Sequence, residues 1–393
     1  MPPVGRISQI FLLFAALLSV PAARGDTLPP VQTVFVILME NYPWSSIKNN
    51  PNAPYINNVL LPMAAHCEQY YNPSNYTCSL LSYFWLEAGT AFGISTDDPH
   101  CGDPPSVHHQ STTNHFVTQL NQAGISWKTY QEGGLPDRML FNDLGTYAVR
   151  HNPFVYFDDV TGTNNQFDPY GVAHVRPYTE LAGDLSSNSV ARYNFITPDI
   201  CHDMHNSCGP LNNPIKQGDT WLAGEIPKLL ASAAYLNNGA IFITWDDPDI
   251  PTAVPVGMIV LSPLVRSNGY VSTNRYTHSS MLRTMQELFR VSPFLGGAAG
   301  ATNLSELFVP GNTNAPGIAR ITSLSLQPGS SQLTVTGLFG NAPLVLEAST
   351  NLSGWSPIST NFLIGGSPPS AIITNSEGGA QRQRYYRLRQ PVP

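Results

Sequence analysis

Acidic and amide side chains follow two apolar runs of strand length in this 393-residue sequence. The run 34–39 (VFVILM) leads into Glu40-Asn41, and the run 240–245 (AIFITW) leads into Asp246-Asp247. In open α/β sheets ligands bind beyond the carboxyl ends of the strands, and adjacent carboxylates repel unless solvent or a cation separates them. Either pair alone also fits a solvated turn. Because the arrangement occurs twice, we predict a divalent-metal site. Its predicted ligands are Glu40, Asn41, Asp246 and Asp247.

A third apolar run, 193–198 (YNFITP), precedes a loop in which carboxylates and imidazoles are crowded together. These residues are Asp199, His202, Asp203 and His205. Such a cluster can bind a second metal ion, hold phosphoryl oxygens or protonate a leaving group. A hydrogen-bonded loop pinned by a Cys201–Cys208 disulfide explains the same residues equally well.

Ser79 begins a stretch that predicts a helix, 79–89 (SLLSYFWLEAG), with apolar residues on one side and Gly89 as its stop. At the N-terminus of a helix the exposed N–H groups and the helix dipole favour an anion, such as a phosphoryl group. An ordinary N-cap serine is the commoner use of serine at this position. These physical arguments alone therefore do not make Ser79 a nucleophile.

The elements that must position these residues divide the chain into parts. From residue 26 to 308, apolar runs of strand length alternate with helix-like segments, which predicts a mostly parallel sheet wrapped by helices. Residues 309–317 (VPGNTNAPG) have linker composition. Residues 318–393 contain short alternating stretches between Gly, Pro, Asn and Ser, and we predict a small β-sandwich there.

The N-terminal 25 residues have the features of a signal peptide. Arg6 precedes the apolar run 10–20, and Ala23-Arg24-Gly25 is a small-x-small cleavage pattern. The run is shorter than the roughly 20 residues that span a bilayer. We predict cleavage near Gly25, no stable membrane insertion, and a mature protein that is secreted, periplasmic or attached to the cell surface.

Composition limits the partners. Only 11% of the residues are charged and the net charge is −7, so a basic surface for nucleic acid is not expected. Five cysteines without a C-x-x-C spacing fit an oxidising compartment better than a thiolate metal site. We expect solvated roles for His100, His108, His109 and His115, and core positions for Trp85 and Trp245.

Several stretches between residues 31 and 290 resemble the acid phosphatase and phospholipase C phosphoesterases of the alkaline-phosphatase-like superfamily. The stretches are Met39-Glu40-Asn41, 85–94 (WLEAGTAFGI), Asp97-Asp98, 123–132 (AGISWKTYQE), 151–157 (HNPFVYF), 194–199 (NFITPD), Asp203-Met204-His205, 244–247 (TWDD) and 276–284 (YTHSSMLRT). The resemblance implies an α/β, alkaline-phosphatase-like three-layer sandwich. It also implies that Glu40, Asn41, Asp246 and Asp247 hold one divalent metal ion.

The family's nucleophile is the serine of a His-Pro-Ser-x-Pro-Asn-Tyr motif, and anchoring on Tyr83 aligns that serine with Ser79. The residues around Ser74 are more similar to this motif, but Ser74 is too far in sequence from the stretch that begins at Trp85. The chain lacks the motif's His, both Pro and the Asn, and Ser82 stands where the Asn would bind a phosphoryl oxygen. We assign catalysis to Ser79, His205 and His278, and substrate binding to Ser82, His151 and Asp203. A second ion is considered near Asp199, His205 and His278.

The resulting prediction is an exported, metal-dependent hydrolase of phosphate monoesters that forms a phosphoseryl intermediate on Ser79. Its partner would be a small phosphorylated substrate. One alternative is a phospholipase C-like phosphodiesterase. The other is a catalytically lapsed surface protein that binds phosphorylated or glycan ligands, which the altered Ser79 motif and the C-terminal domain favour. The C-terminal segment resembles β-domains appended to exported bacterial proteins, and we expect a bacterial source. Contact with the cell surface, sorting and simple stabilisation are alternative roles for this segment.

Overall fold

The computed structural model describes residues 28–73, 77–95, 100–250, 252–266, 269–309, 320–327, 330–336, 344–350, 355–362, 370–375 and 384–389. The predicted signal peptide, Ser74 and nearly all of the predicted linker lie outside the described residues, so those interpretations stay predictions. So do the predicted domain boundaries.

An eight-stranded sheet in the order β5-β4-β6-β1-β7-β8-β2-β9 organises the larger part of the chain. Only β8 runs antiparallel to its neighbours, β7 and β2, so the sheet is mostly parallel, as predicted. The strands are β1 (Thr33–Met39), β2 (Ala65–Cys67), β4 (Trp127–Gln131), β5 (Val175–Pro177), β6 (Tyr193–Thr197), β7 (Gly239–Trp245), β8 (Met258–Leu261) and β9 (Tyr270–Ser272). A separate parallel pair joins β3 (Tyr70–Tyr71) to β10 (Tyr276–Thr277).

The helices are mostly short, with two longer ones of 17 and 12 residues. The α-helices are α1 (Trp44–Ile47), α2 (Leu61–Met63), α3 (Ser79–Ala88), α4 (Pro105–His108), α5 (Phe116–Gln122), α6 (Asp158–Thr161), α7 (Pro169–His174), α8 (Leu181–Ser186), α9 (Pro214–Leu230), α10 (Ala233–Leu236) and α11 (His278–Phe289). A π-helical turn covers Ile56–Leu60, and 3₁₀ turns cover Val149–His151, Pro153–Tyr156, Tyr178–Glu180, Gly296–Gly300 and Ser305–Leu307.

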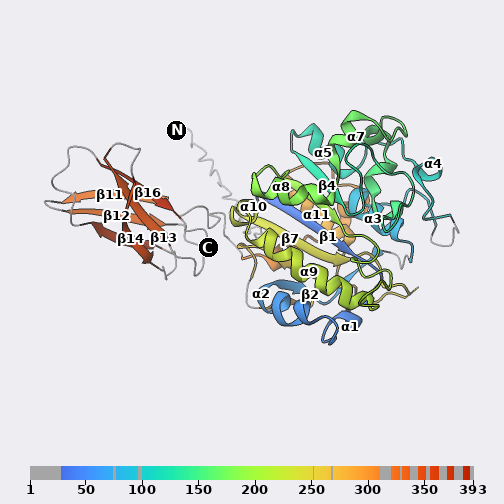
Figure 1. Cartoon of the computed structure of the whole chain (residues 1–393), viewed down its shortest axis with the longest axis horizontal. Coiled ribbons are helices and arrows are strands. Elements are labelled where there is room, and N and C mark those ends of the chain that lie inside the picture. The colour runs from blue at the N-terminus through green and yellow to red at the C-terminus, as the bar shows by residue number, and fades with distance from the viewer. Residues whose placement is uncertain are drawn as a thin grey trace, which may run out of the picture.

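The two faces of the sheet are covered by different helices. Side chains alternate across a strand, and Val34 of β1 is paired in register with Tyr193 of β6. Tyr193 packs against the rings of Phe116 in α5 and Phe289 in α11. The other face, which carries Met39, meets α9, and Figure 1 shows α9 lying across the sheet in front of β1 and β7. The chain therefore forms helix, sheet and helix layers.

The central strands are buried because both faces are covered. β7 is buried along its whole length, and β1 from Val34 to Met39. This explains their continuously apolar sequences. The register pairs Met39 with Trp245, so the next residues, Glu40 and Asp246, are neighbours at the carboxyl edge of the sheet.

The C-terminal strands form two antiparallel three-stranded sheets, in the orders β11-β12-β15 and β14-β13-β16 (orange to red in Figure 1). Their bounds are β11 (Arg320–Gln327), β12 (Ser330–Thr336), β13 (Leu344–Ser349), β14 (Ser356–Phe362), β15 (Ser370–Asn375) and β16 (Tyr385–Arg389). The predicted all-β character of this region is confirmed. Among the described helices of the whole chain, none is long and apolar enough to cross a membrane.

Candidate active site

Glu40 is the centre of a buried polar site at the carboxyl end of β1. Its side chain is 0% exposed. The Ser79 hydroxyl donates to Glu40 Oε2 at 3.0 Å, and the Tyr83 hydroxyl donates to Oε1 at 2.7 Å. By strand alternation Glu40 points to the same sheet face as Val34 and Val36, the face that Tyr193 shares with α5 and α11. Its partners both come from α3, because Ser79 and Tyr83 are four residues apart and so lie on one side of that helix.

Ser79 is the first residue of α3, as its sequence predicts, and Gly89 caps the helix in the left-handed conformation at φ 69°. Cys78, the residue before Ser79, is linked by a disulfide to Cys101. The backbone at Ser79 is therefore held by the helix on one side and by the disulfide of its neighbour on the other. The N-terminal end of the helix is at the same place, and a helix N-terminus suits an anionic ligand.

Four carboxylates meet at this site, and all are 0% exposed: Glu40, Asp203, Asp246 and Asp247. The Asp246 N–H donates to the Met39 carbonyl at 2.9 Å, which continues the sheet ladder one residue further. The Asn41 N–H then donates to Asp246 Oδ1 at 3.2 Å. The backbone thus brings the two predicted strand-end pairs together.

Burial raises the pKa of each of these four carboxyl groups well above its usual value, and neighbouring carboxylates raise it further. One oxygen each of Asp203, Asp246 and Asp247 has no hydrogen-bond partner among the described residues. Unpaired buried carboxylates are costly. A divalent cation with a preference for oxygen ligands would satisfy these atoms, so the residues fit such an ion.

A second set of ligand-capable atoms overlaps the first. Atoms of Glu40, His151 and His205 lie within 4.8 Å of one another. His205 Nε2, however, accepts a hydrogen bond from the Arg150 guanidinium at 3.2 Å. That nitrogen therefore already has a hydrogen-bond partner.

His151 lies between two of the carboxylates. Its Nε2 is 3.5 Å from Glu40 Oε2, and its Nδ1 is 3.2 Å from Asp203 Oδ2. Its ring stacks on that of Tyr83, with 5.5 Å between centroids and 6° between planes. Burial, and then the neighbouring Arg150 and His205, lower the pKa of His151 well below its usual value. The imidazole is therefore neutral near pH 7.

His205 is half-buried and its two nitrogens have different partners. Nδ1 bonds to Asn206 Oδ1 at 2.7 Å, and Nε2 accepts from Arg150. The guanidinium therefore fixes the tautomer, with the proton on Nδ1. Arg150 is also 3.6 Å from Asp143, and its planar fork is suited to phosphoryl oxygens.

His278 has a supporting position, contrary to the expectation that it grips substrate or protonates a leaving group. It is fully buried, its Nε2 is 2.8 Å from the Asp246 carbonyl, and its Nδ1 is 3.0 Å from the Tyr70 hydroxyl. A carbonyl only accepts, so Nε2 carries the proton and Nδ1 accepts from Tyr70. Burial lowers the pKa of His278 to about 4. With both nitrogens engaged, His278 orients Asp246.

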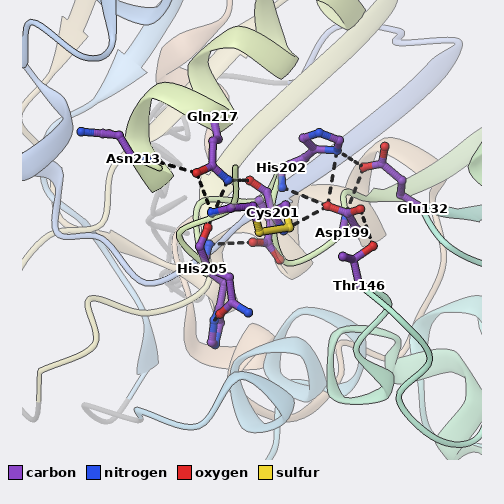
Figure 2. Close-up of a disulfide and its surroundings, with 11 residues drawn as sticks. Glu132, Thr146, Asp199, Cys201, His202, His205, Asn213 and Gln217 are labelled. Carbon is purple, nitrogen blue, oxygen red and sulfur yellow. Dashed lines mark hydrogen bonds and ion pairs between the residues drawn. A yellow bond between two sulfur atoms is a disulfide. The ribbon is translucent and has the colours of Figure 1, made fainter. Parts of the chain in front are cut away.

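The acidic and histidine residues of the loop after β6, which were predicted as one cluster, lie in two separate groups. Asp203 and His205 join the site, whereas Asp199 and His202 pair with Glu132: His202 Nδ1 is 3.0 Å from Glu132 Oε2 and 3.3 Å from Asp199 Oδ1. Figure 2 shows this second group apart from His205, on the other side of the Cys201–Cys208 disulfide. Asp199 is therefore not grouped with His205 or His278 in the way predicted for a second ion; instead, ligand-capable atoms of Asp199, Glu132 and His202 lie within 4.8 Å of one another.

Other expectations divide in the same way. The Cys201–Cys208 pair is confirmed, and Cys67 is a buried free cysteine. Trp245 is in the core, as predicted. The solvated role of His115 is wrong: it is 0% exposed, 2.9 Å from Glu87 and from Asp159, and its ring stacks on Phe157.

Tyr83 and Arg150 are site residues that were not predicted from the sequence. The four-residue spacing from Ser79 could have indicated Tyr83, since it places both on one helix face. Arg150 precedes His151 in a 3₁₀ turn and had no comparable signal. Ser82, predicted to bind substrate, is buried on α3 one turn after Ser79, and its hydroxyl has no partner among the described residues.

Fold and site together define an α/β protein with a serine beside clustered buried acids, and comparison with known proteins identifies the class. Residues 49–292 match the Phosphoesterase family, and the chain belongs to that family. It is thus a hydrolase of phosphoric esters, and the predicted α/β fold, with a mostly parallel central sheet and an all-β C-terminal region, is confirmed.

Three curated relatives illustrate the range of the family. The chain is 24% identical over 290 residues to a phosphatidylinositol-3-phosphatase of Mycobacterium tuberculosis, covering 72% of this chain and 85% of the relative. It is 25% identical to a probable acid phosphatase of Kluyveromyces lactis (52% of this chain, 48% of the relative). It is 22% identical to phospholipase C A of M. tuberculosis (44% and 32%). Against these last two, the chain matches half of the relative's length or less.

Proposed function

We propose that this protein is an exported, divalent-metal-dependent phosphatase that hydrolyses phosphate monoesters through Ser79. The observation that carries the proposal is the Ser79 hydroxyl, which is 3.0 Å from Glu40 Oε2 at the N-terminus of α3. A nucleophile, an anion-binding helix end and a buried carboxylate set coincide there. Phosphatases among the relatives support the monoester as substrate, and two disulfides favour an oxidising compartment.

The ion would be held by Glu40, Asn41, Asp246 and Asp247. A divalent cation at such a site lowers the pKa of a nearby hydroxyl and offsets the charge of phosphoryl oxygens. The carboxylate oxygens of Asp246 and Asp247 that have no partner among the described residues are the ligands best placed for this. His278 and Tyr70 support the set by fixing the Asp246 backbone.

The side chains of this chain account for the two stages of the reaction. Ser79 Oγ gives up its proton and forms a bond to phosphorus while the bond to the alcohol oxygen breaks, and that oxygen takes the electron pair and a proton. Glu40 Oε2 already accepts the hydrogen bond of the attacking hydroxyl. Water then cleaves the phosphoserine and restores Ser79. The first-turn N–H groups of α3 and the Arg150 guanidinium would hold the phosphoryl oxygens meanwhile.

The test is hydrolysis of p-nitrophenyl phosphate beside bis-p-nitrophenyl phosphate by the purified protein and its Ser79→Ala variant, with and without chelator. We expect monoester turnover that is lost in Ser79→Ala and in chelator, and that returns with added divalent ion. Preferential turnover of the diester would support the phospholipase C-like alternative. Folded protein that turns over neither ester with any divalent ion would support the lapsed binding protein instead.

A further inference from the structure

The loop between β6 and α9 carries two side chains of the site and makes three contacts that shape it. The Asp203 carbonyl accepts the Glu40 N–H at 2.8 Å. Asp203 Oδ1 accepts the His205 N–H at 2.7 Å, and Oδ2 is 3.2 Å from His151. The position of this loop therefore determines where Asp203, His205 and, through them, His151 lie relative to Glu40.

Gln217 on α9 holds this loop at both ends of the segment that enters the site. It is 5% exposed. Its Nε2 donates to the Cys201 carbonyl at 2.7 Å and to the Asn206 carbonyl at 3.1 Å. Its Oε1 accepts the N–H groups of Cys208 at 2.9 Å and Asn213 at 3.2 Å. Figure 2 shows Gln217 at the centre of these contacts, with the Cys201–Cys208 disulfide beside it.

The next residue, Gly218, makes room for the middle of the same segment. Met204 lies between Asp203 and His205, is fully buried, and has φ 87°, which is unusual for a residue other than glycine. A Cβ on Gly218 would be 2.4 Å from Met204 Cγ and 2.9 Å from Met39 Cε. The Met204 sulfur also accepts the Trp245 indole N–H at 3.4 Å. A side chain at position 218 would therefore force Met204 to move.

We propose that Gln217 and Gly218 are positioning residues for phosphoester hydrolysis, which together form the surface of α9 that binds residues 201–206 and fixes their position. Met204 anchors the loop on the α9 side, and this turns Asp203 and His205 toward Glu40 and His151. The proposal rests on the proposed function, because it assigns these residues to the same reaction.

The glycine distinguishes a positioning role from simple loop anchoring. A glycine inside a helix weakens the helix relative to alanine, so helix stability alone gives no reason for Gly218. Gly224 lies in the same helix, and a Cβ there would meet nothing within 4 Å. The two glycines are thus a matched pair: the same substitution has the same effect on the helix, but only Gly218→Ala displaces Met204.

The experiment compares Gly218→Ala with Gly224→Ala in the full chain. We expect Gly224→Ala to keep the wild-type kcat/KM and to unfold at an equal or higher temperature. Gly218→Ala should remain folded and lose about 100-fold in kcat, with a smaller change in KM, since a misplacement of about 1 Å costs a rate of this order. Equal activity of the two variants, in a wild type that turns over, would overturn the inference.

Hydrogen exchange gives a readout that does not depend on activity. The Asn206 N–H donates to the Ile200 carbonyl at 2.6 Å across this loop. In Gly218→Ala its exchange, and that of its neighbours in 200–208, should accelerate at least about tenfold, as expected for local opening, while Gly224→Ala leaves them unchanged. Unchanged exchange in Gly218→Ala overturns the inference whether or not the wild type is active. Absence of wild-type turnover with accelerated exchange would contradict only the proposed function.

Gln217→Met provides a second test of the proposal, with Gln286→Met as its control. Gln286 is also a buried amide that holds a loop, through the Pro293 carbonyl and the Leu295 N–H. Both substitutions should lower the unfolding temperature. At a temperature where both variants are fully folded, only Gln217→Met should lose kcat, by about tenfold or more. Comparable losses of kcat in both would assign Gln217 to stability alone and contradict the proposal.

Discussion

The Tyr83 hydroxyl donates a 2.7 Å hydrogen bond to Glu40 Oε1, on the carboxylate whose other oxygen accepts the Ser79 hydroxyl. One helix face therefore holds both oxygens of the buried acid. The arrangement fixes the distance between the nucleophile and the acid, because Ser79 and Tyr83 are joined by a single turn of α3.

We expect Tyr83→Phe to lower both stability and activity. The variant leaves one oxygen of a fully buried carboxylate without its donor, which costs about 1–3 kcal/mol of unfolding free energy. A loosened Glu40 should also reduce kcat/KM about tenfold, equivalent to about 1.4 kcal/mol in the barrier. Urea denaturation and p-nitrophenyl phosphate turnover measure the two effects. Tyr178→Phe is the control, since Tyr178 donates to Glu225 at the same 2.7 Å away from the site; an equal fall in its kcat/KM would contradict the role of Tyr83.

Asp247→Asn should weaken metal binding and stabilise the metal-free protein. Asp247 is fully buried and one of its oxygens has no partner among the described residues. Removing that charge removes a desolvation cost, so in chelator we expect Asp247→Asn to melt at a higher temperature than wild type. Added divalent ion should then raise the wild-type melting temperature more than that of the variant. Asp249→Asn, at an exposed position, should respond to the ion like wild type. A variant that is less stable than wild type in chelator would argue against an ion site here.

Ser82→Ala tests whether this serine still contacts substrate. Its hydroxyl is buried and unpartnered among the described residues, so its removal should leave stability unchanged or raise it by up to about 1–3 kcal/mol. If Ser82 bonds a phosphoryl oxygen, as predicted, kcat/KM should fall about tenfold while Ser79→Ala abolishes turnover. Unchanged kcat/KM would remove Ser82 from the substrate-binding residues.

Glu306 should make a pH-dependent contribution to stability. Burial raises its pKa, but hydrogen bonds from Ser272, Tyr276, Tyr270 and Asn274 outweigh burial, and the pKa in the folded protein is below the ordinary value of 4.5. A depressed carboxyl pKa contributes stability that is present above about pH 4.5 and is lost as the pH falls through the folded-state pKa. The difference in unfolding free energy between wild type and Glu306→Gln should therefore be constant from neutral pH to about pH 5 and shrink below it. A difference that grows on acidification would show that the assigned hydrogen bonds are wrong.

The sequence was sufficient to predict that the strand-end acids meet and that Ser79 begins a helix. Continuous apolar runs identify β1 and β7, and neighbouring parallel strands end at one edge of the sheet, so Glu40 and Asp246 had to be close. The helix stop at Gly89 and the start at Ser79 are local signals that the structure keeps. Tertiary context adds only the register that makes them neighbours.

The sequence does not predict which residues of the loop after β6 enter the site and which pair with Glu132, because this depends on tertiary contacts. Asp199 and Asp203 are both aspartates of the same polar loop, so the sequence does not distinguish them. The left-handed backbone at Met204 and its packing against Gly218 direct the side chain of Asp203 into the site. His115 fails for a related reason: its polar neighbourhood predicts exposure, while stacking on Phe157, with 3.8 Å between centroids, buries it.

Cys67 is a natural probe for local opening of the central sheet at β2. The thiol is in β2, buried, and burial raises its pKa above the usual value. Such a thiol is protonated and unreactive in the folded protein, and it does not compete for the two disulfides that border Ser79 and Asp203. The rate at which a thiol reagent labels Cys67 will therefore measure how often this part of the sheet separates, with no added probe.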